Sequence, residues 1–290
     1  VDDPTSLFWN PAGIANARNI EFTVNHNDWI FDLTHSYIAA VMPAGRVGHF
    51  GLSINYLDMG KMERTTELAP EGDGTSFSAS DIAIGFAYAK KMSDRFNVGI
   101  QLKMIQESIS FSSASAVAID AGSQYITRFS GLKIGIAITN FGSKLTLNGT
   151  DQKVDIDPFV ELDGNPDVVA NLRTEDWPLP MAFRMGLSFQ PLGPESLIRN
   201  NFLTLTVNTD YYDSRDLNPY FVSGVEFKVG KLFYLRSGTR FEYLHFSESY
   251  DDLSSSELDD KSNTELYINR FSWGFGLSSE SFPFFPYKMN

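Results

Sequence analysis

Four histidines and a run of aspartates are the side chains that would first suggest an active site or a metal site. The histidines are His26, His35, His49 and His245, and none has the i, i+4 or paired spacing of metal ligands. A Ser–His pair for ester hydrolysis would use His35 or His245 as its base, while the simpler interpretation is a structural histidine.

The aspartates between Asp151 and Asp167 lack the D-x-D-x-D-G order of a calcium loop, so only weak calcium binding is left as an alternative. Cysteine is absent, which excludes a thiol nucleophile and cysteine-ligated metals. The sequence therefore predicts no catalytic residue, no metal, no cofactor and no enzymatic activity.

A second set of charged side chains is more informative, because its members fall at alternate positions within apolar stretches. Alternation places such residues on the face opposite to their apolar neighbours in a β-strand. We expect this face to be interior, with the charges paired in a salt-bridged network; a polar conduction path is the alternative. The set consists of Lys103, Asp120, Arg184, Asp210, Glu226, Lys228, Arg236, Arg240 and Glu242.

The stretch Leu179–Gln190 shows the alternation most clearly, with Met181, Phe183 and Met185 among its large apolar residues and small or polar residues between them. The same pattern recurs along the chain and predicts twelve strands. They are Asn19–His26, Leu33–Met42, Val47–Leu57, Ile82–Ala89, Phe96–Met104, Val117–Thr127, Leu132–Ile138, Leu179–Gln190, Phe202–Tyr211, Tyr220–Val229, Phe233–Tyr243 and Phe271–Ser278.

The connections between these strands fall into two classes. Those after the even-numbered strands are mostly tight, whereas Asp58–Ser80, Gly142–Pro178 and Leu244–Asn269 are long and polar. Short turns at one end and long loops at the other are typical of an outer-membrane β-barrel. A soluble all-β protein, the alternative, has no reason to sort its loops by length.

Composition agrees with a membrane barrel. Hydrophobic residues make up 42% and aromatic residues 14%, and no run approaches the length of a membrane helix. The net charge of -13 argues against nucleic acid as a partner. We therefore predict an all-β fold, a transmembrane antiparallel up-and-down β-barrel in the bacterial outer membrane.

The two ends of the chain differ from its middle. Residues 1–18 are turn-rich and apolar, and we expect a plug or lid there, with Pro11 and Gly13 interrupting a short helical turn, and the barrel in residues 19–290. We expect a signal peptide to have preceded Val1. Because Ser281–Asn290 resembles a turn and the start of a strand, we also expect about two further strands, making about fourteen.

The motif Leu7-Phe8-Trp9-Asn10-Pro11-Ala12-Gly13 resembles the N-terminal signature of the PorV/PorQ family, relatives of the FadL fatty-acid transporters. Ala116–Gly142 and Trp177–Phe189 are also similar to PorV. The resemblance implies a fourteen-stranded FadL-like barrel with the Asn-Pro-Ala element in an internal plug. The missing last strands and the acidic loops depart from the family pattern.

The resemblance implies a subunit of the type IX protein secretion system. Such a subunit binds a large outer-membrane translocon and secreted cargo with C-terminal signal domains, and hands the cargo to surface attachment proteins. The alternative is a FadL-like transporter of hydrophobic small molecules, with an apolar pocket between plug and wall. In both cases the lipid bilayer surrounds the barrel.

Overall fold

The computed structural model describes residues 3–129, 131–157, 168–194, 196–243 and 266–277. His245, Asp163, Asp167, most of the acidic loop between Leu244 and Asn269, and the tail Ser281–Asn290 lie outside these residues. The chain divides into two units. The first contains residues 1–91, 98–122 and 139–181, and the second contains residues 92–97, 123–138 and 182–290.

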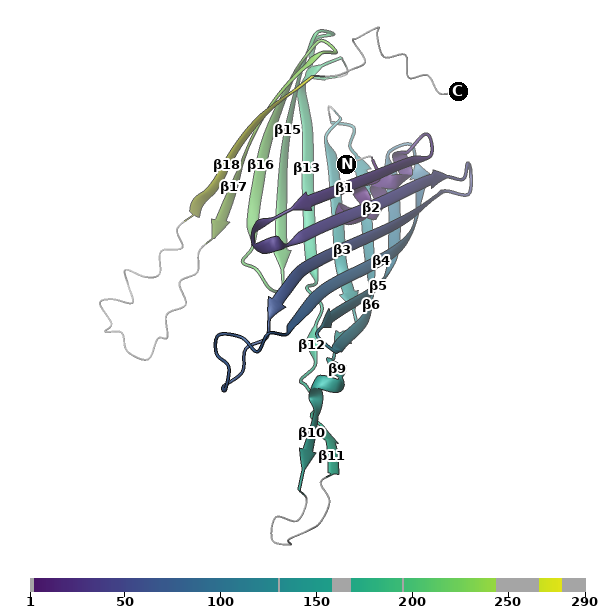
Figure 1. Ribbon diagram of the computed structural model, residues 1–290. Coiled ribbons are helices and arrows are strands. Elements are labelled where there is room, and N and C mark those ends of the chain that lie inside the picture. Colours follow the sequence, from purple (N-terminus) through teal and green to yellow (C-terminus); the bar gives the residue numbers. More distant parts are fainter. Residues whose placement is uncertain (1–2, 130, 158–167, 195, 244–265, 278–290) are drawn as a thin grey trace, which may run out of the picture. The chain divides into compact units, whose positions relative to one another are not determined.

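Most strands of the described residues belong to one large sheet in which nearly all neighbours are antiparallel and consecutive (Figure 1); two further sheets have two strands each. The twelve main strands of the large sheet follow the order β1-β2-β3-β4-β5-β6-β7-β13-β15-β16-β17-β18. Their bounds are β1 Glu21–Asp28, β2 Thr34–Pro43, β3 His49–Glu63, β4 Ser76–Ser93, β5 Phe96–Ile109, β6 Ser112–Ile126, β7 Lys133–Gly142, β13 Ala182–Gly193, β15 Leu203–Ser214, β16 Tyr220–Val229, β17 Phe233–Tyr243 and β18 Leu266–Leu277. The predicted all-β, up-and-down fold is confirmed, with the twelve strands in the predicted order.

Helical structure among the described residues is short. It consists of α1 Ser6–Trp9 and the 3-10 turns η1 Pro11–Asn16, η2 Ile30–Asp32 and η3 Thr150–Gln152. No helix in this part of the chain has the length and apolarity needed to cross a membrane. Pro11 was expected to interrupt a helical turn, and instead it begins η1, because proline suits the first position of a helix, where no N–H bond is needed.

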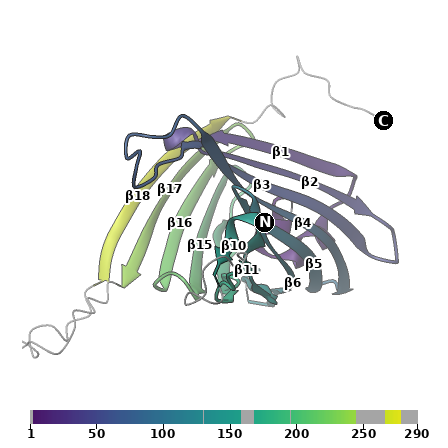
Figure 2. The ribbon, with the colours of Figure 1, turned by 60° about the horizontal axis from the view of Figure 1, so that its bottom comes forward.

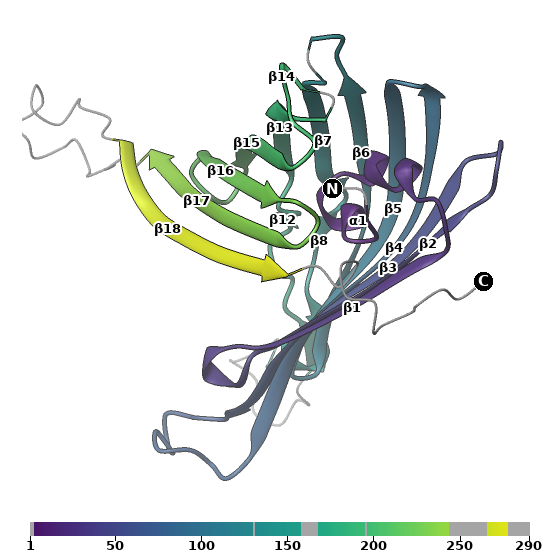
Figure 3. The ribbon, with the colours of Figure 1, turned by 90° about the horizontal axis from the view of Figure 1, so that it is seen from above.

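The first unit has two faces of opposite character. Cross-strand rows such as Phe22–Ala40–Leu52–Phe86 lie on its outer face, where the large side chains are exposed. Rows such as Ala39–Ser53–Gly85 lie on its inner face, which carries small residues and is covered by α1 and η1 (Figure 3). Large apolar residues outside and small ones inside reverse the pattern of a soluble sandwich.

The second unit repeats the alternation on β13, β15, β16, β17 and β18, which lie side by side (Figure 2). Its apolar face carries Val225, Leu235, Trp273 and Phe275, all exposed. We call the opposite face, which carries Arg184, the polar face. The expected strand Phe271–Ser278 begins earlier, at Leu266, because β17 continues to offer pairing partners as far as Tyr243.

Two predicted loops contain more structure than the sequence indicated. In the expected loop Asp58–Ser80, β3 continues to Glu63 and β4 begins at Ser76, because a bulge between Asp58 and Lys61, with Gly60 at φ +71°, lets pairing resume.

The expected loop Gly142–Pro178 contains short paired strands that extend away from the sheet in Figure 1. They are β8 Lys144–Leu145 with β12 Trp177–Pro178, β9 Asn148–Gly149 with β6, and β10 Lys153–Ile156 with β11 Val168–Asn171. Buried apolar residues such as Leu145 and Leu179 anchor this region to β6. Elsewhere, β6 begins at Ser112 instead of Val117, and β14 Ile198–Arg199 pairs with the end of β13 inside the expected connection Pro191–Asn200.

Candidate functional site

The N-terminal segment lies in a seat made by glycines on the inner face of the first unit. A Cβ on Gly51 of β3 would lie 2.7 Å from Leu7 Cδ2, and one on Gly99 of β5 would lie 2.5 Å from the Ala12 backbone nitrogen. Gly122 of β6 faces Asn10 in the same way. The absence of side chains at these positions lets the segment approach the strand backbones closely.

Apolar packing and hydrogen bonds fix the segment in this seat. Leu7 and Ile14 are fully buried among alanines of β2 and β4. The Tyr37 hydroxyl of β2 donates to the Pro4 carbonyl at 3.4 Å, and His49 Nε2 of β3 bonds the Ala17 carbonyl at 3.0 Å. The residues of the expected plug motif thus lie against this wall: Phe8 and Trp9 in α1, Asn10 between the two helical pieces, and Pro11, Ala12 and Gly13 in η1.

Asn10 holds the turn between the two helical pieces. Its side-chain oxygen accepts the backbone N–H of Ala12 at 3.0 Å, as an N-cap residue does. Pro11 follows at the first helical position. The Asn-Pro-Ala element is therefore explained locally, as the cap and first turn of η1.

Phe8 and Trp9 expose an aromatic surface on the same segment. Their rings pack edge to face with centroids 4.9 Å apart, and Phe8 also packs on Tyr37 at 6.1 Å. Phe8 is 41% exposed and Trp9 48%, although Leu7, directly before them, is buried. Apolar rings left accessible next to a buried wall are typical of a surface that binds apolar molecules.

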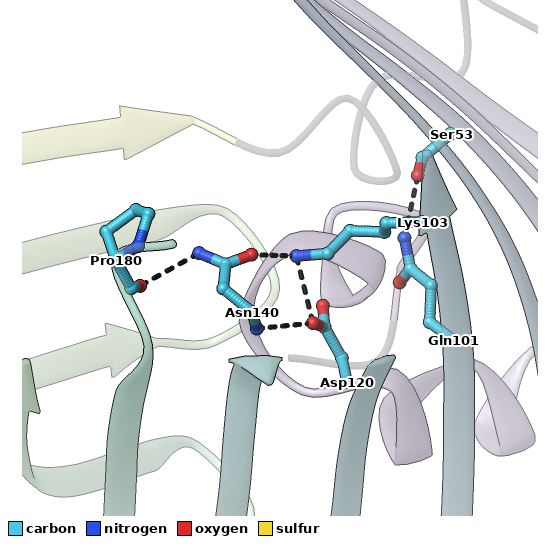
Figure 4. Close-up of polar contacts among 6 residues, drawn as sticks. All are labelled: Ser53, Gln101, Lys103, Asp120, Asn140 and Pro180. Carbon is cyan, nitrogen blue, oxygen red and sulfur yellow. Dashed lines mark hydrogen bonds and ion pairs between the residues drawn. The ribbon is translucent and has the colours of Figure 1, made fainter. Parts of the chain in front are cut away.

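A buried polar cluster lies on β5, β6 and β7 (Figure 4). Lys103 Nζ lies 2.9 Å from Asp120 Oδ1, and the two side chains are only 15% and 2% exposed. Asp120 Oδ1 also accepts the backbone N–H of Asn140 at 2.7 Å. Lys103 donates to the Asn140 side chain, whose Nδ2 donates to the Pro180 carbonyl at 3.0 Å. Charge and hydrogen-bond partners together satisfy the buried carboxylate.

The backbone of Asn140 explains how the cluster forms. It has φ +60°, a left-handed conformation that asparagine tolerates better than most residues. This local turn near the end of β7 directs the backbone N–H of Asn140 to Asp120 and its side-chain amide to the carbonyl of Pro180. Pro180 lies two residues before β13 begins. Nearby, Gln101 Nε2 donates to Ser53 Oγ at 3.0 Å, connecting β5 to β3 across Gly85 of β4.

The polar face of the second unit holds the remaining predicted interior charges. Arg236 Nε lies 2.6 Å from Glu226 Oε2, and Arg240 Nη2 lies 3.4 Å from Glu242 Oε1. Arg184 lies over the Tyr212 ring at 5.0 Å, and Arg240 lies over the Tyr220 ring at 3.7 Å. These arginines and glutamates are thus distributed over ion pairs and aromatic rings.

Among the histidines that the structure describes, His35 does not meet a serine. Its Nε2 lies 2.5 Å from Asn55 Oδ1, on the inner face. His26 instead contacts Ser36 and Asp28 on the outer face. Sequence spacing contained a signal for this contact, because His26 and Asp28 are two residues apart on one strand and therefore share a face.

The aspartates considered for calcium behave as structural groups where they are described. Asp151 Oδ2 accepts the backbone N–H of Phe111 at 3.0 Å and lies 3.3 Å from the Ser112 hydroxyl. The Phe111 hydrogen bond, first among several contacts, holds the pKa of Asp151 below its usual value. In the described ranges no three His, Asp or Glu residues come together as metal ligands.

Comparisons with known proteins give structural similarity only. No protein-family model and no curated protein matches the chain. The CymD monoaromatic hydrocarbon channel superposes with a TM-score of 0.49 at 10% identity, over 83% of this chain and 79% of that one. The Ralstonia pickettii toluene transporter TbuX gives 0.48 at 13% identity, over 82% and 81%. A Pseudomonas aeruginosa FadL homologue gives 0.43 at 14% identity, over 83% and 76%.

Proposed function

We propose that this chain is a bacterial outer-membrane β-barrel protein with an internal N-terminal plug. One observation carries the proposal: large apolar side chains are exposed on one face of the sheet, while the opposite face of the first unit is small, polar and covered. In water, a protein with such an apolar surface would aggregate, whereas in a membrane the lipid chains would cover the surface. The exposed residues include Phe22, Val24, Ile38, Leu52, Ile84, Phe86, Leu102, Leu235, Trp273 and Phe275.

We infer that the transported molecules are hydrophobic and small, in the manner of FadL-like transporters. The exposed rings of Phe8 and Trp9 support this, because they offer an apolar contact surface on the plug itself. The glycine seat keeps that surface close to the wall.

Uptake through a lipopolysaccharide-containing outer membrane tests this proposal. Cells that produce the protein should take up a radiolabelled aromatic hydrocarbon faster than cells that do not. The double variant Phe8→Ala/Trp9→Ala should lose most of the increase, and Trp29→Ala, which removes an exposed ring outside the plug, should keep it. Equal uptake with and without the protein would contradict transport.

A second candidate is the secretion role that the PorV/PorQ resemblance implies. One observation favours it: β10 and β11 form a projecting ribbon in which Val154, Ile156, Val168 and Ala170 share one face, and Ile156 and Val168 are exposed. An exposed apolar face on a ribbon outside the main sheet is suited to a protein partner. The partners would be the translocon subunit, cargo with C-terminal signal domains, and surface attachment proteins.

Affinity purification in mild detergent separates the two candidates. Recovery of a very large outer-membrane protein or of cargo with shared C-terminal domains, lost in Ile156→Asp/Val168→Asp, would support secretion. Val169→Asp, which changes the opposite face of the same ribbon, is the matched control. Purification of the chain with lipid alone would contradict the secretion role and leave the transporter.

A further inference from the structure

Three side chains on the outer face of β1 and β2 are arranged like a hydrolytic triad. His26 Nδ1 lies 2.8 Å from Ser36 Oγ, and His26 Nε2 lies 3.3 Å from Asp28 Oδ1. With the ring proton on Nε2, the imidazole accepts from the serine and donates to the carboxylate. A nucleophile within reach of a base, and a base oriented by a third group, are the geometric requirements of an activated serine.

Strand geometry produces this arrangement without any special loop. His26 and Asp28 are two residues apart on β1 and therefore point to the same side. Ser36 is the residue directly opposite His26 in the antiparallel register of β1 with β2. Directly opposed residues have Cβ atoms about 5 Å apart, which is within hydrogen-bonding reach for histidine and serine side chains.

The triad lies at the boundary of the apolar outer face. The next row toward the middle of the strands is Val24–Ile38–Ile54–Ile84. On the other side, the connection from β1 to β2 carries the exposed side chains of Trp29, Ile30 and Phe31. In a membrane, a polar row between two apolar zones lies near the interface, where the ester groups of lipids are found.

We propose that Ser36, His26 and Asp28 form an acyl-ester hydrolase site that acts on lipid esters of the surrounding membrane. The inference goes beyond the transport function and depends only on the outer face contacting lipid. It departs from the expectation that the chain has no enzymatic role. Among the described histidines, His26 contacts a serine, whereas His35 contacts Asn55.

The reaction has two steps, acylation of Ser36 and hydrolysis of the acyl-serine. Ser36 Oγ forms a bond to the ester carbonyl carbon and its proton moves to His26 Nδ1; the carbonyl reforms as the alcohol leaves with that proton. Water then attacks the acyl-serine, His26 takes the water proton and returns it to Ser36 Oγ, and the fatty acid is released. Asp28 stabilises the imidazolium in each step.

A hydrogen-bond donor is needed to stabilise the negative charge that develops on the carbonyl oxygen in the transition state. Tyr56 lies directly opposite Ser36 in the register of β2 with β3, on the same face, and is partly exposed. Its hydroxyl is the donor that we assign to the oxyanion. Tyr56→Phe is therefore expected to lower hydrolysis while leaving the Ser36–His26 contact intact.

The test uses the full chain in mixed micelles of detergent and phospholipid. A fluorophosphonate probe should label Ser36, as located by mass spectrometry, and a fluorogenic phospholipid should be hydrolysed. Ser36→Ala should abolish both signals, and His26→Gln should lower both about 100-fold or more. Thr34→Ala, which removes a neighbouring hydroxyl on the same face, should change neither signal.

Each contrary result has a definite meaning. No labelling of Ser36, or labelling that His26→Gln leaves unchanged, would overturn the triad. Labelling of Ser36 without phospholipid hydrolysis would overturn the assignment of lipid esters as substrates. Because Phe8→Ala/Trp9→Ala should leave labelling unchanged, failure of transport and failure of the hydrolase can be told apart.

Discussion

Asp120 Oδ1 lies 2.9 Å from Lys103 Nζ in the first unit, on the same strand as Gly122, which faces Asn10; Asp120 is fully buried and Lys103 is largely buried. Asp120 also accepts the backbone N–H of Asn140, so one carboxylate connects β5, β6 and β7. A buried charge that loses its partner is left uncompensated in a medium of low polarity. The pair should therefore matter for stability in a way that can be measured.

Asp120→Ala should destabilise the folded chain by about 3–5 kcal/mol, because it leaves the Lys103 ammonium without its carboxylate. The change can be measured by equilibrium unfolding in lipid vesicles. The double variant Lys103→Met/Asp120→Leu should recover most of the loss, because it removes both charges. Equal losses in the single and double variants would show that packing, and not charge pairing, dominates at this position.

Gly99→Val should displace the N-terminal segment, because a Cβ at Gly99 would lie 2.5 Å from the Ala12 backbone nitrogen, which cannot move aside as a flexible side chain can. The chain has no natural cysteine, so Ile14→Cys gives a single buried thiol as a reporter. Maleimide should label this thiol faster in the Gly99→Val background.

Gly274→Val is the matched control, because a Cβ there meets nothing within 4 Å. The thiol of Ile14→Cys should remain as protected in this background as in the parent. If Gly99→Val also left the thiol protected, the contact between the segment and β5 would not be what holds the plug in place.

Much of the strand order could be predicted from the sequence, because period-two alternation depends only on the geometry of a single strand. Leu179–Gln190 was predicted as a strand, and β13 lies within and just beyond it, at Ala182–Gly193. The strand pairing inside the expected loops was less predictable. The bulge at Gly60 and the pairs β8–β12 and β10–β11 depend on contacts between residues far apart in the sequence.

The candidate sites show the same limit. Alternation could place Lys103 and Asp120 on one face, but their direct contact depends on which residues oppose each other across β5 and β6. Similarly, His26 and Asp28 share a face by spacing alone, whereas the contact with Ser36 requires the register of β1 with β2. The left-handed turn at Asn140 gave no sequence signal beyond the residue type itself.

Acidification should release Asp151 from Phe111. Because hydrogen bonds lower the pKa of the folded carboxyl, its contribution to stability is present above the unfolded pKa, about 3.9, and is lost as the pH falls through the lowered folded value. Hydrogen exchange of the Phe111 amide, corrected for intrinsic rates, should therefore show protection near neutral pH and progressive loss in strong acid.

Asp151→Asn provides the control for this titration. It should weaken protection of the Phe111 amide at neutral pH and remove most of the acid-dependent change. If the Phe111 amide of the parent chain stayed equally protected at both extremes, the Asp151 carboxylate would not be what holds η3 on the turn between β5 and β6.

Phe86→Arg tests the orientation of the whole sheet toward lipid. Phe86 is 56% exposed on the outer face, in the row with Leu52 and Phe22, well inside β4. A charge on the lipid-facing side of a barrel costs about 2–4 kcal/mol near the bilayer midplane and about 0–1 kcal/mol near the interfaces. Unfolding in lipid vesicles should show the larger loss for Phe86→Arg. Phe31→Arg, in the connection between β1 and β2, should show the smaller one, and equal small losses would mean that the outer face does not contact lipid.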